Sequence, residues 1–261
     1  VVVDYDRLIL ATGSKPFVPP IPGADLKGVM SFRDIYDVNT MLDYCASHKN
    51  AVVIGGGLLG LEAAYGLKQR GMNVTVLHLT DRIMDRQLDA KASTMLKASI
   101  EAKGIEIITE ANTEALLGQE GHVQQLRLKD GRTLPADLVI FAVGIRPNMS
   151  LAQSAGLRCN RGVLVNDTMQ TFDPSIYAVG ECIEHRNQTF GLVEPLWGQA
   201  FICASHLAEH GSLTFKAPTV PTQLKVSGCD VFSAGRIDIE ASAPKEDFED
   251  IVLNDEKRQI Y

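Results

Sequence analysis

The sequence predicts an α/β fold built on parallel β-sheets. Three observations lead to this prediction. Apolar strand-like segments alternate with helical segments along residues 32–148, a glycine-rich turn at 55–60 joins one such strand to one such helix, and the strand pattern of residues 6–13 returns at 137–144. Strands alternating with helices are typical of βαβ units and a parallel sheet.

The first segment of the chain, residues 6–13, reads as an apolar strand. A connector follows at 14–23, where four prolines exclude a helix and a central strand. The next regular element is a helix at 35–46. The chain begins without methionine and stops at Tyr261 without a recognisable cap or tail, so we expect a protein that is longer at both ends.

The glycine-rich turn has the spacing G-x-G-x-x-G in Gly55, Gly57 and Gly60, after a strand at 51–54 and before a helix at 58–70. The first glycine allows the tight turn, the second lets the backbone approach a pyrophosphate, and the third lets the helix pack on its strand. The phosphates then rest on free N–H groups at the start of the helix. A structural glycine turn is the alternative, but the strand and the helix on either side favour a dinucleotide site.

A strand at 73–79 completes one βαβ unit, and a helix at 89–103 with a strand at 105–109 adds a second. Turns at 119–121 and 129–131 separate short alternating segments, which predicts an antiparallel meander.

The closing strand at 137–144 repeats the opening strand at 6–13. The matching residues fall at identical spacing and are Asp6 and Asp137, Ile9 and Ile140, Ala11 and Ala142, and Gly13 and Gly144. Two nucleotide-binding domains, the second inserted into the first, would produce this repeat. A chance match of two buried strands is the alternative.

The composition is that of an ordinary globular protein, with 45% hydrophobic and 22% charged residues. A net charge of −7 provides no basic surface for nucleic acid, and the sequence contains neither a membrane-spanning apolar run nor an apolar leader. The five cysteines are scattered without C-x-x-C spacing, so we expect no disulfide framework and no metal site. These features favour a cytoplasmic protein that binds neither nucleic acid nor membranes.

Several motifs resemble those of the two-dinucleotide flavoprotein reductases, a family that includes glutathione, ferredoxin and rubredoxin reductases. The resemblance covers nearly the whole chain. Its markers are residues 11–13, 55–60 with Glu62, 144–148 and 177–181. A finer resemblance, to the large subunits of assimilatory NAD(P)H-dependent nitrite reductases, lies in residues 86–89, 180–186, 191–197 and 224–235.

The resemblance implies a Rossmann-like, three-layer NAD(P)H domain with a β-meander, inserted into an FAD domain. The expected boundaries are 1–31 for a fragment of the FAD domain, 32–148 for the NAD(P)H domain, 149–212 for the continuation of the FAD domain and 213–261 for the start of a C-terminal domain. Because the sequence has one glycine-rich turn, the main cradle for the FAD pyrophosphate is missing from this chain.

The resemblance also implies roles on the FAD side. Thr12 and Gly13 lie against FAD, and Glu181, where most such reductases have Asp, accepts hydrogen bonds from the ribityl chain. Leu196 and Trp197 belong to the segment under the isoalloxazine ring, although Trp197 could equally fill the core. The full set of expected cofactor-binding residues is Thr12, Gly13, Gly55, Gly57, Leu58, Leu59, Gly60, His78, Gly144, Gly180, Glu181, Leu196 and Trp197.

On the nicotinamide side, Glu62 matches a position near the reacting ring and is the one expected catalytic residue. A carboxylate near a helix N-terminus is also stabilising without a function. His78 stands where NAD-specific sites place Asp or Glu, and no cation follows it directly, so NADH is favoured over NADPH. Arg146 and Asn148 are expected to shape the crossover between the domains, and Arg33 to brace it.

The resemblance therefore implies an NAD(P)H-dependent flavoprotein oxidoreductase that passes hydride from NADH to FAD, as the electron input of nitrite reduction to ammonium. Its acceptor would be a downstream metal centre, with iron–sulfur and sirohaem groups outside this chain, and a homodimer is one possible assembly. The alternatives are a rubredoxin or ferredoxin reductase and a nucleotide-binding module without turnover.

Overall fold

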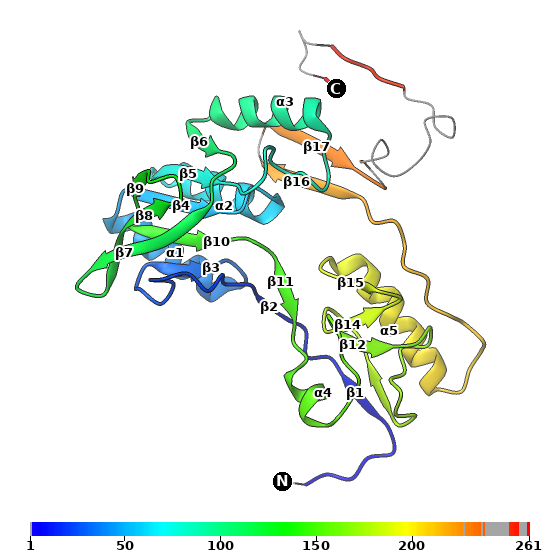
Figure 1. The fold of residues 1–261 in the computed structure, drawn as a ribbon. Coiled ribbons are helices and arrows are strands. Elements are labelled where there is room, and N and C mark those ends of the chain that lie inside the picture. The colour runs from blue at the N-terminus through cyan, green and yellow to red at the C-terminus, as the bar shows by residue number, and fades with distance from the viewer. Residues whose placement is uncertain (1, 227, 236, 238–250, 256–259) are drawn as a thin grey trace. The chain divides into compact units, whose positions relative to one another are not determined.

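The structure, a computed structural model, describes residues 2–226, 228–235, 237, 251–255 and 260–261. The chain forms two compact units (Figure 1). Unit 1 consists of Val1–Pro16 and Gly144–Val220, and unit 2 of Phe17–Val143 and Pro221–Tyr261. Unit 2 is thus inserted into unit 1, as the repeated strand pattern predicts.

Unit 2 is built on a five-stranded sheet in which every pair of neighbours is parallel. The order of the strands is β3 (Val29–Ser31), β10 (Leu138–Phe141), β4 (Asn50–Ile54), β5 (Asn73–Leu77) and β6 (Ile105–Ile108). Strands of such a sheet are covered on both faces, which is why β4 and β10 read as continuous apolar runs. The predicted α/β class with a parallel sheet is confirmed.

Helices pack on one face of this sheet and a meander packs on the other. Alternate strand residues such as Val53, Val76 and Ile140 share a core with α1 (Ile35–Ser47), α2 (Leu58–Gln69) and α3 (Ala90–Glu101). The residues between them join the meander in a separate core that includes Val52, Val139, Phe141, Leu116, Leu126 and Leu128. The three predicted layers are therefore present.

The meander is antiparallel and consists of β7 (Thr113–Gln119), β8 (His122–Leu128) and β9 (Thr133–Pro135). The two turns predicted from the sequence connect these strands. Glu120 and Gly121, in the first turn, both have φ values in the left-handed region, at 53° and 80°. This geometry is characteristic of tight hairpin turns.

Two of the helices in unit 2 begin at aspartates that cap them. The Asp34 carboxylate accepts the N–H groups of Tyr36 and Asp37, and Asp37 in turn accepts the Asp34 N–H. Asp89 accepts the Ala92 N–H at 2.8 Å and begins α3. Such caps satisfy N–H groups that a helix leaves free at its start.

A hairpin of β16 (Thr222–Val226) and β17 (Cys229–Ser233) belongs to unit 2. Its inward residues Leu224, Val226 and Cys229 are part of the same core as α2 and α3. In Figure 1, β17 lies beside α3. The sequence-based boundary places 213–261 in a C-terminal domain. The structure instead packs this hairpin against the Rossmann-like layer of helices.

Unit 1 contains small sheets and two helices. The parallel pair β1 (Leu8–Leu10) and β13 (Ile176–Ala178) shares one core with α4 (Ser150–Ser154), α5 (Val193–Leu207), β12 (Val163–Val165) and β14 (Ile183–His185). The exposed strand β15 (Gln188–Thr189) pairs with β14 outside this core. The two repeated segments, β1 and β10, are both parallel strands, and the glycines that follow them, Gly13 and Gly144, have φ values of 64° and 101°.

Two features differ from the sequence prediction. The proline-containing connector includes a short strand, β2 (Ser14–Pro16), which pairs antiparallel with β11 (Ile145–Pro147). Proline is compatible with a two-stranded ladder because each strand has one edge that faces no partner strand. A residue without an N–H can stand where the backbone nitrogen points to that edge. The division between the units falls after Pro16 and after Val143, whereas the sequence places it after residues 31 and 148. Among the described residues, none of the helices has the length and apolar character needed to cross a membrane.

Candidate functional site

The glycine turn between β4 and α2 has a distinct structural reason for each of its three glycines. Gly55 has φ 123°, and its N–H donates to the Leu77 carbonyl at 2.8 Å. A Cβ on Gly55 would collide with the Ala142 carbonyl oxygen, and a Cβ on Gly60 would collide with that of Gly55. Both positions therefore exclude a side chain through the close approach of backbone to backbone.

Gly57 differs from these two, because a Cβ there would meet no atom within 4 Å. Its φ of −88° and ψ of −174° suit any residue, so the fold itself does not demand glycine. Gly57 is the N-cap of α2, and it has no side chain to cap the helix. The first N–H groups of α2, from Leu58 and Leu59 onward, consequently begin the helix beside open space.

These features fit a pyrophosphate. An uncapped helix start carries free N–H groups and the positive end of the helix dipole, and both attract an anion. The space beside Gly57, where a Cβ would meet no atom within 4 Å, could receive a phosphate group. The residues expected at the nucleotide, Gly55, Gly57, Leu58, Leu59 and Gly60, all lie in this one turn.

His78 follows β5 directly and lies beneath the same turn. Its Nδ1 accepts the Gly56 N–H at 2.9 Å, and its Nε2 lies 3.7 Å from an Asp85 carboxylate oxygen. The side chain is 13% exposed. Burial lowers the pKa of His78, an effect that outweighs the opposing influence of Asp85, the Arg82 backbone and Asp81. The imidazole is therefore uncharged at neutral pH.

Glu62 lies one turn along α2, half-buried, and one of its carboxylate oxygens accepts the Lys225 N–H at 3.3 Å. This contact ties the hairpin to the helix that carries the glycine turn. The sequence offered no sign of this partner, because 162 other residues separate the two positions.

In unit 1, the loop after β1 is held by Asn148. The Thr12 hydroxyl donates to the Asn148 carbonyl at 2.7 Å, the Asn148 N–H donates to the Gly13 carbonyl at 2.8 Å, and the Asn148 amide donates to the Thr12 carbonyl at 3.3 Å. Arg146 pairs across the ladder with Lys15. Asn148 therefore holds the loop after β1 by three hydrogen bonds within unit 1. The Arg33 N–H donates to Asp37 just before α1.

Glu181 is buried, and Ser14 donates to its Oε2 at 2.6 Å. This bond joins the segment after β13 to the loop after β1. The preceding Gly180 has φ 94°, and its N–H donates to the Oε1 atom of Gln199 on α5 at 2.8 Å. Thr12, Gly13, Gly180 and Glu181 are thus brought into one connected group.

Sequence reasoning missed Ser14 and Gln199. Gln199 is fully buried, and its Nε2 has no hydrogen-bond partner among the described residues. A glutamine within the otherwise apolar run of α5 is the one signal that could have identified it, because buried polar groups need partners.

Trp197 is 73% exposed, so the alternative that it fills the core is wrong. It lies two positions from Gln199, which is about 200° around a helix. The helix face that contacts Gly180 is therefore not the face that carries Trp197. Leu196 is half-buried and packs against the core of unit 1.

The expected cofactor residues separate by unit. Gly55, Gly57, Leu58, Leu59, Gly60, Glu62 and His78 belong to unit 2, and Thr12, Gly13, Gly144, Gly180, Glu181, Leu196 and Trp197 belong to unit 1. This separation is what two nucleotide sites on two domains would produce.

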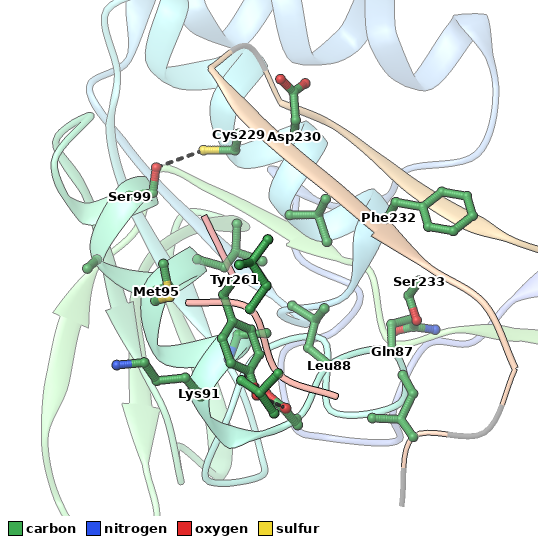
Figure 2. A pocket seen from close by; sticks show the side chains of 18 of the residues that line it. Gln87, Leu88, Lys91, Met95, Ser99, Cys229, Asp230, Phe232, Ser233 and Tyr261 are labelled. Atoms are coloured by element: carbon green, nitrogen blue, oxygen red, sulfur yellow. Dashed lines mark hydrogen bonds between the residues drawn. The ribbon is translucent and has the colours of Figure 1, made fainter. Parts of the chain in front are cut away.

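A groove of about 1170 Å³ lies elsewhere in unit 2 (Figure 2). Leu88, Lys91 and Met95 line it from the side of α3, and Phe232 and Ser233 line it from β17. The Ser99 hydroxyl lies 3.1 Å from the Cys229 sulfur at its edge. None of the expected cofactor residues is among the described residues that line this groove.

Residues 2–200 match the family model described as "Pyridine nucleotide-disulphide oxidoreductase". A nitrite reductase [NAD(P)H] of Bacillus subtilis is 51% identical over 257 residues, which are 98% of this chain and 31% of that protein. An assimilatory nitrate reductase electron transfer subunit of the same organism is 43% identical over 259 residues, or 99% of this chain and 33% of that protein. The chain thus spans about a third of the length of these relatives.

Among solved structures, a ferredoxin reductase from Rhodopseudomonas palustris superposes with a TM-score of 0.83 at 27% identity. The match covers 90% of this chain and 59% of that protein.

Proposed function

The chain belongs to the pyridine nucleotide-disulphide oxidoreductase family, and from this membership we propose that it is the electron-input part of an NADH-dependent flavoprotein oxidoreductase. The membership confirms the resemblance to the two-dinucleotide reductases. Unit 2 would bind the nicotinamide nucleotide, and unit 1 would contribute contacts to FAD. When bound, FAD would supply the hydride-accepting chemistry.

The glycine turn carries this proposal. Gly57 leaves open space at the uncapped start of α2, while Gly55 and Gly60 are required by backbone contacts alone. The leucine N–H groups at 58 and 59 would hold the pyrophosphate of the nucleotide. Glu62, on the same helix, is proposed to lie toward the nicotinamide.

The residues proposed for FAD are those of the connected group in unit 1. Thr12 and Gly13 would line the cofactor, and Glu181, positioned by Ser14, would accept a hydrogen bond from a cofactor hydroxyl. Trp197 is exposed and offers an aromatic face. Gly144 and Gly180 would allow the turns that bring the backbone close, since both have positive φ.

The nucleotide we propose is NADH. Its adenosine ribose carries a hydroxyl where NADPH carries a phosphate, and the uncharged His78 supplies no cation for a phosphate. Titrating the purified chain with each nucleotide by calorimetry tests this preference. Tighter binding of NADPH would contradict it, and binding of neither would contradict the nucleotide site.

We further propose that the whole protein passes these electrons to a metal centre and reduces nitrite to ammonium, because of the 51% identity to a nitrite reductase. Nicotinamide-dependent dye reduction by a longer protein that contains this segment tests the electron input. Retention of bound flavin without dye reduction would favour a nucleotide-binding module without turnover.

The structural likeness to a ferredoxin reductase supports a second candidate, a reductase that delivers electrons to a small iron–sulfur protein or rubredoxin. Oxidation of NADH by the longer protein distinguishes the two candidates. Oxidation that depends on nitrite would favour the nitrite reductase. We propose that the protein is cytoplasmic, since the spacing of the five cysteines in the sequence is not that of a disulfide framework. A homodimer is proposed for the assembly.

A further inference from the structure

His78 occupies the end of β5, but its ring turns back under the glycine turn. Its Nδ1 accepts the Gly56 N–H at 2.9 Å. Gly56 makes room for the ring, because a Cβ on it would come within 3.1 Å of the imidazole and 2.8 Å of Ile83. The Gly56 carbonyl in turn accepts the Met84 N–H at 2.9 Å. Gly56 is thus held on both sides by the segment 78–84.

The bond from Gly56 fixes the protonation of the imidazole. A backbone N–H can only donate, so Nδ1 must keep its lone pair, and the proton of a neutral ring lies on Nε2. A doubly protonated ring would direct an N–H at another N–H and lose the bond. Nε2 lies 3.7 Å from Asp85, beyond hydrogen-bond distance.

The groups that act on the charge of His78 come from the loop that follows it, namely the carboxylates of Asp85 and Asp81 and the backbone of Arg82. The other neighbours provide backbone groups, with the Ile108 carbonyl accepting the His78 N–H and the Ala111 N–H donating to the His78 carbonyl. The two carboxylates favour a charged ring, but burial opposes it more strongly. The geometry and the surroundings therefore agree on an uncharged ring.

We propose that His78 is a positioning residue of the nucleotide site, whose uncharged ring holds Gly56 and thereby the turn that receives the pyrophosphate. Binding of the nucleotide then requires that the ring carry no second proton. This inference rests on the proposed nucleotide site. It assigns to His78 the support of the turn, in place of direct recognition of the ribose.

The sign of the pH dependence follows from the lowered pKa. The contact is fully present above the ordinary histidine pKa of about 6.5 and is lost as the pH falls through the lower value in the folded protein. Below that value, the affinity should fall by about tenfold for each pH unit, because one proton must leave before binding.

The test uses ADP-ribose, which contains the pyrophosphate but lacks the acid-labile reduced nicotinamide. Its dissociation constant is measured by calorimetry from about pH 8 to about pH 5, spanning the histidine range. His78→Asn supplies an amide oxygen in place of Nδ1 and does not titrate in this range. This variant should bind nearly as tightly as the unmodified chain at pH 8 and keep that affinity at pH 5.

His78→Leu has no acceptor for Gly56 and should bind weakly at every pH. His122→Asn is the matched control, since His122 is an exposed histidine on β8 of the same unit. It should retain the full pH dependence. Thermal melts identify any variant that fails to fold, and an NMR titration of the Gly56 amide follows the release of the turn without any ligand.

A pH-independent affinity of the unmodified chain, or a steep pH dependence in His78→Asn, would overturn the inference. An affinity of His78→Leu equal to that of the unmodified chain at pH 8 would do the same. Absence of ADP-ribose binding at pH 8 by the unmodified chain would overturn the proposed nucleotide site together with it, whereas binding with the wrong pH profile would overturn the role of His78 alone.

Discussion

At the level of single residues, some glycines of the turn at 55–60 are required by the fold, and another leaves space that a ligand would require. Gly55 and Gly60 are fixed by collisions with backbone atoms, whereas a side chain on Gly57 would enter open space. Variants at these positions should therefore affect stability and binding differently.

Gly57→Val should abolish nucleotide binding and change the unfolding midpoint little, because its side chain fills the space of the pyrophosphate. Gly60→Ala should lower stability by at least about 1–3 kcal/mol, the typical cost of overpacking, because the new Cβ would collide with the Gly55 carbonyl oxygen. Calorimetric titration with NADH and thermal melts of both variants check this.

The matched control is Gly66→Ala, in the third turn of the same helix, where a Cβ meets nothing within 4 Å. It should leave binding intact and stabilise the chain by about 0.5–1 kcal/mol, because alanine favours a helix interior over glycine. If Gly57→Val bound NADH as tightly as Gly66→Ala, the pyrophosphate would not lie at the turn.

A second prediction at this scale concerns Asp167 in unit 1. Arg186, and after it His185, donate to this carboxylate and lower its pKa from 3.8 to about 2. A carboxyl with a lowered pKa adds stability above its ordinary pKa and loses it as the pH falls through the folded value.

The unmodified chain should therefore lose more stability than Asp167→Asn between about pH 4 and pH 2. Urea unfolding midpoints of the two chains, which should converge toward the lower pH, check this. Asp43→Asn, at an exposed position on α1, is the control and should not converge in the same way. Parallel curves for Asp167→Asn would contradict the proposed linkage.

Part of the candidate site could be predicted from residue type and spacing. The glycine turn could be predicted, because a tight turn and a close approach of backbone atoms leave no room for a side chain. The contacts of His78 with Gly56 and of Gln199 with Gly180 could not, because they join positions whose proximity only the folded chain creates. The exposure of Trp197 depends in the same way on neighbours that its local sequence does not specify.

At the level of elements, the helices and strands of the Rossmann-like layer follow closely from apolar periodicity and from their caps. The hairpin β16–β17 does not. Its alternation of Leu224 and Val226 with polar residues indicates that one face is buried, but not which part of the chain buries it. The sequence therefore could not tell a separate C-terminal domain from an addition to unit 2.

Leu224→Ala tests the placement of the hairpin. Leu224 is 3% exposed and lies in the core shared with α2 and α3, so its truncation should cost about 2–5 kcal/mol in the unfolding of unit 2. Phe232→Ala, at a residue of the same hairpin that is 72% exposed, should change stability by about 0.5 kcal/mol or less. Thermal melts of both variants make the comparison, and equal effects would show that the hairpin does not share the core.

At the level of the whole molecule, the sequence provides one G-x-G-x-x-G turn, and it lies in unit 2. Unit 1 carries the residues proposed to contact FAD but no second G-x-G-x-x-G turn in its sequence. The purified chain should therefore bind ADP-ribose in a one-to-one ratio while carrying little flavin.

A visible absorption spectrum of the purified chain, and of the supernatant after denaturation, measures the flavin. A stoichiometric flavin content would mean that unit 1 holds FAD without a glycine turn. In that case the assignment of cofactors to the two units would have to be revised.

The ladder between β2 and β11 places Pro16 opposite Ile145, so the segment 17–143 leaves and re-enters unit 1 at neighbouring points. Two adjoining splice points suffice to exchange this segment, provided that the incoming segment still packs on the hairpin β16–β17, which shares its core. Recombination between relatives at these two points would exchange the segment that carries the proposed nucleotide site and leave the paired strands of unit 1 in place. The same two points are where a laboratory chimaera would be joined.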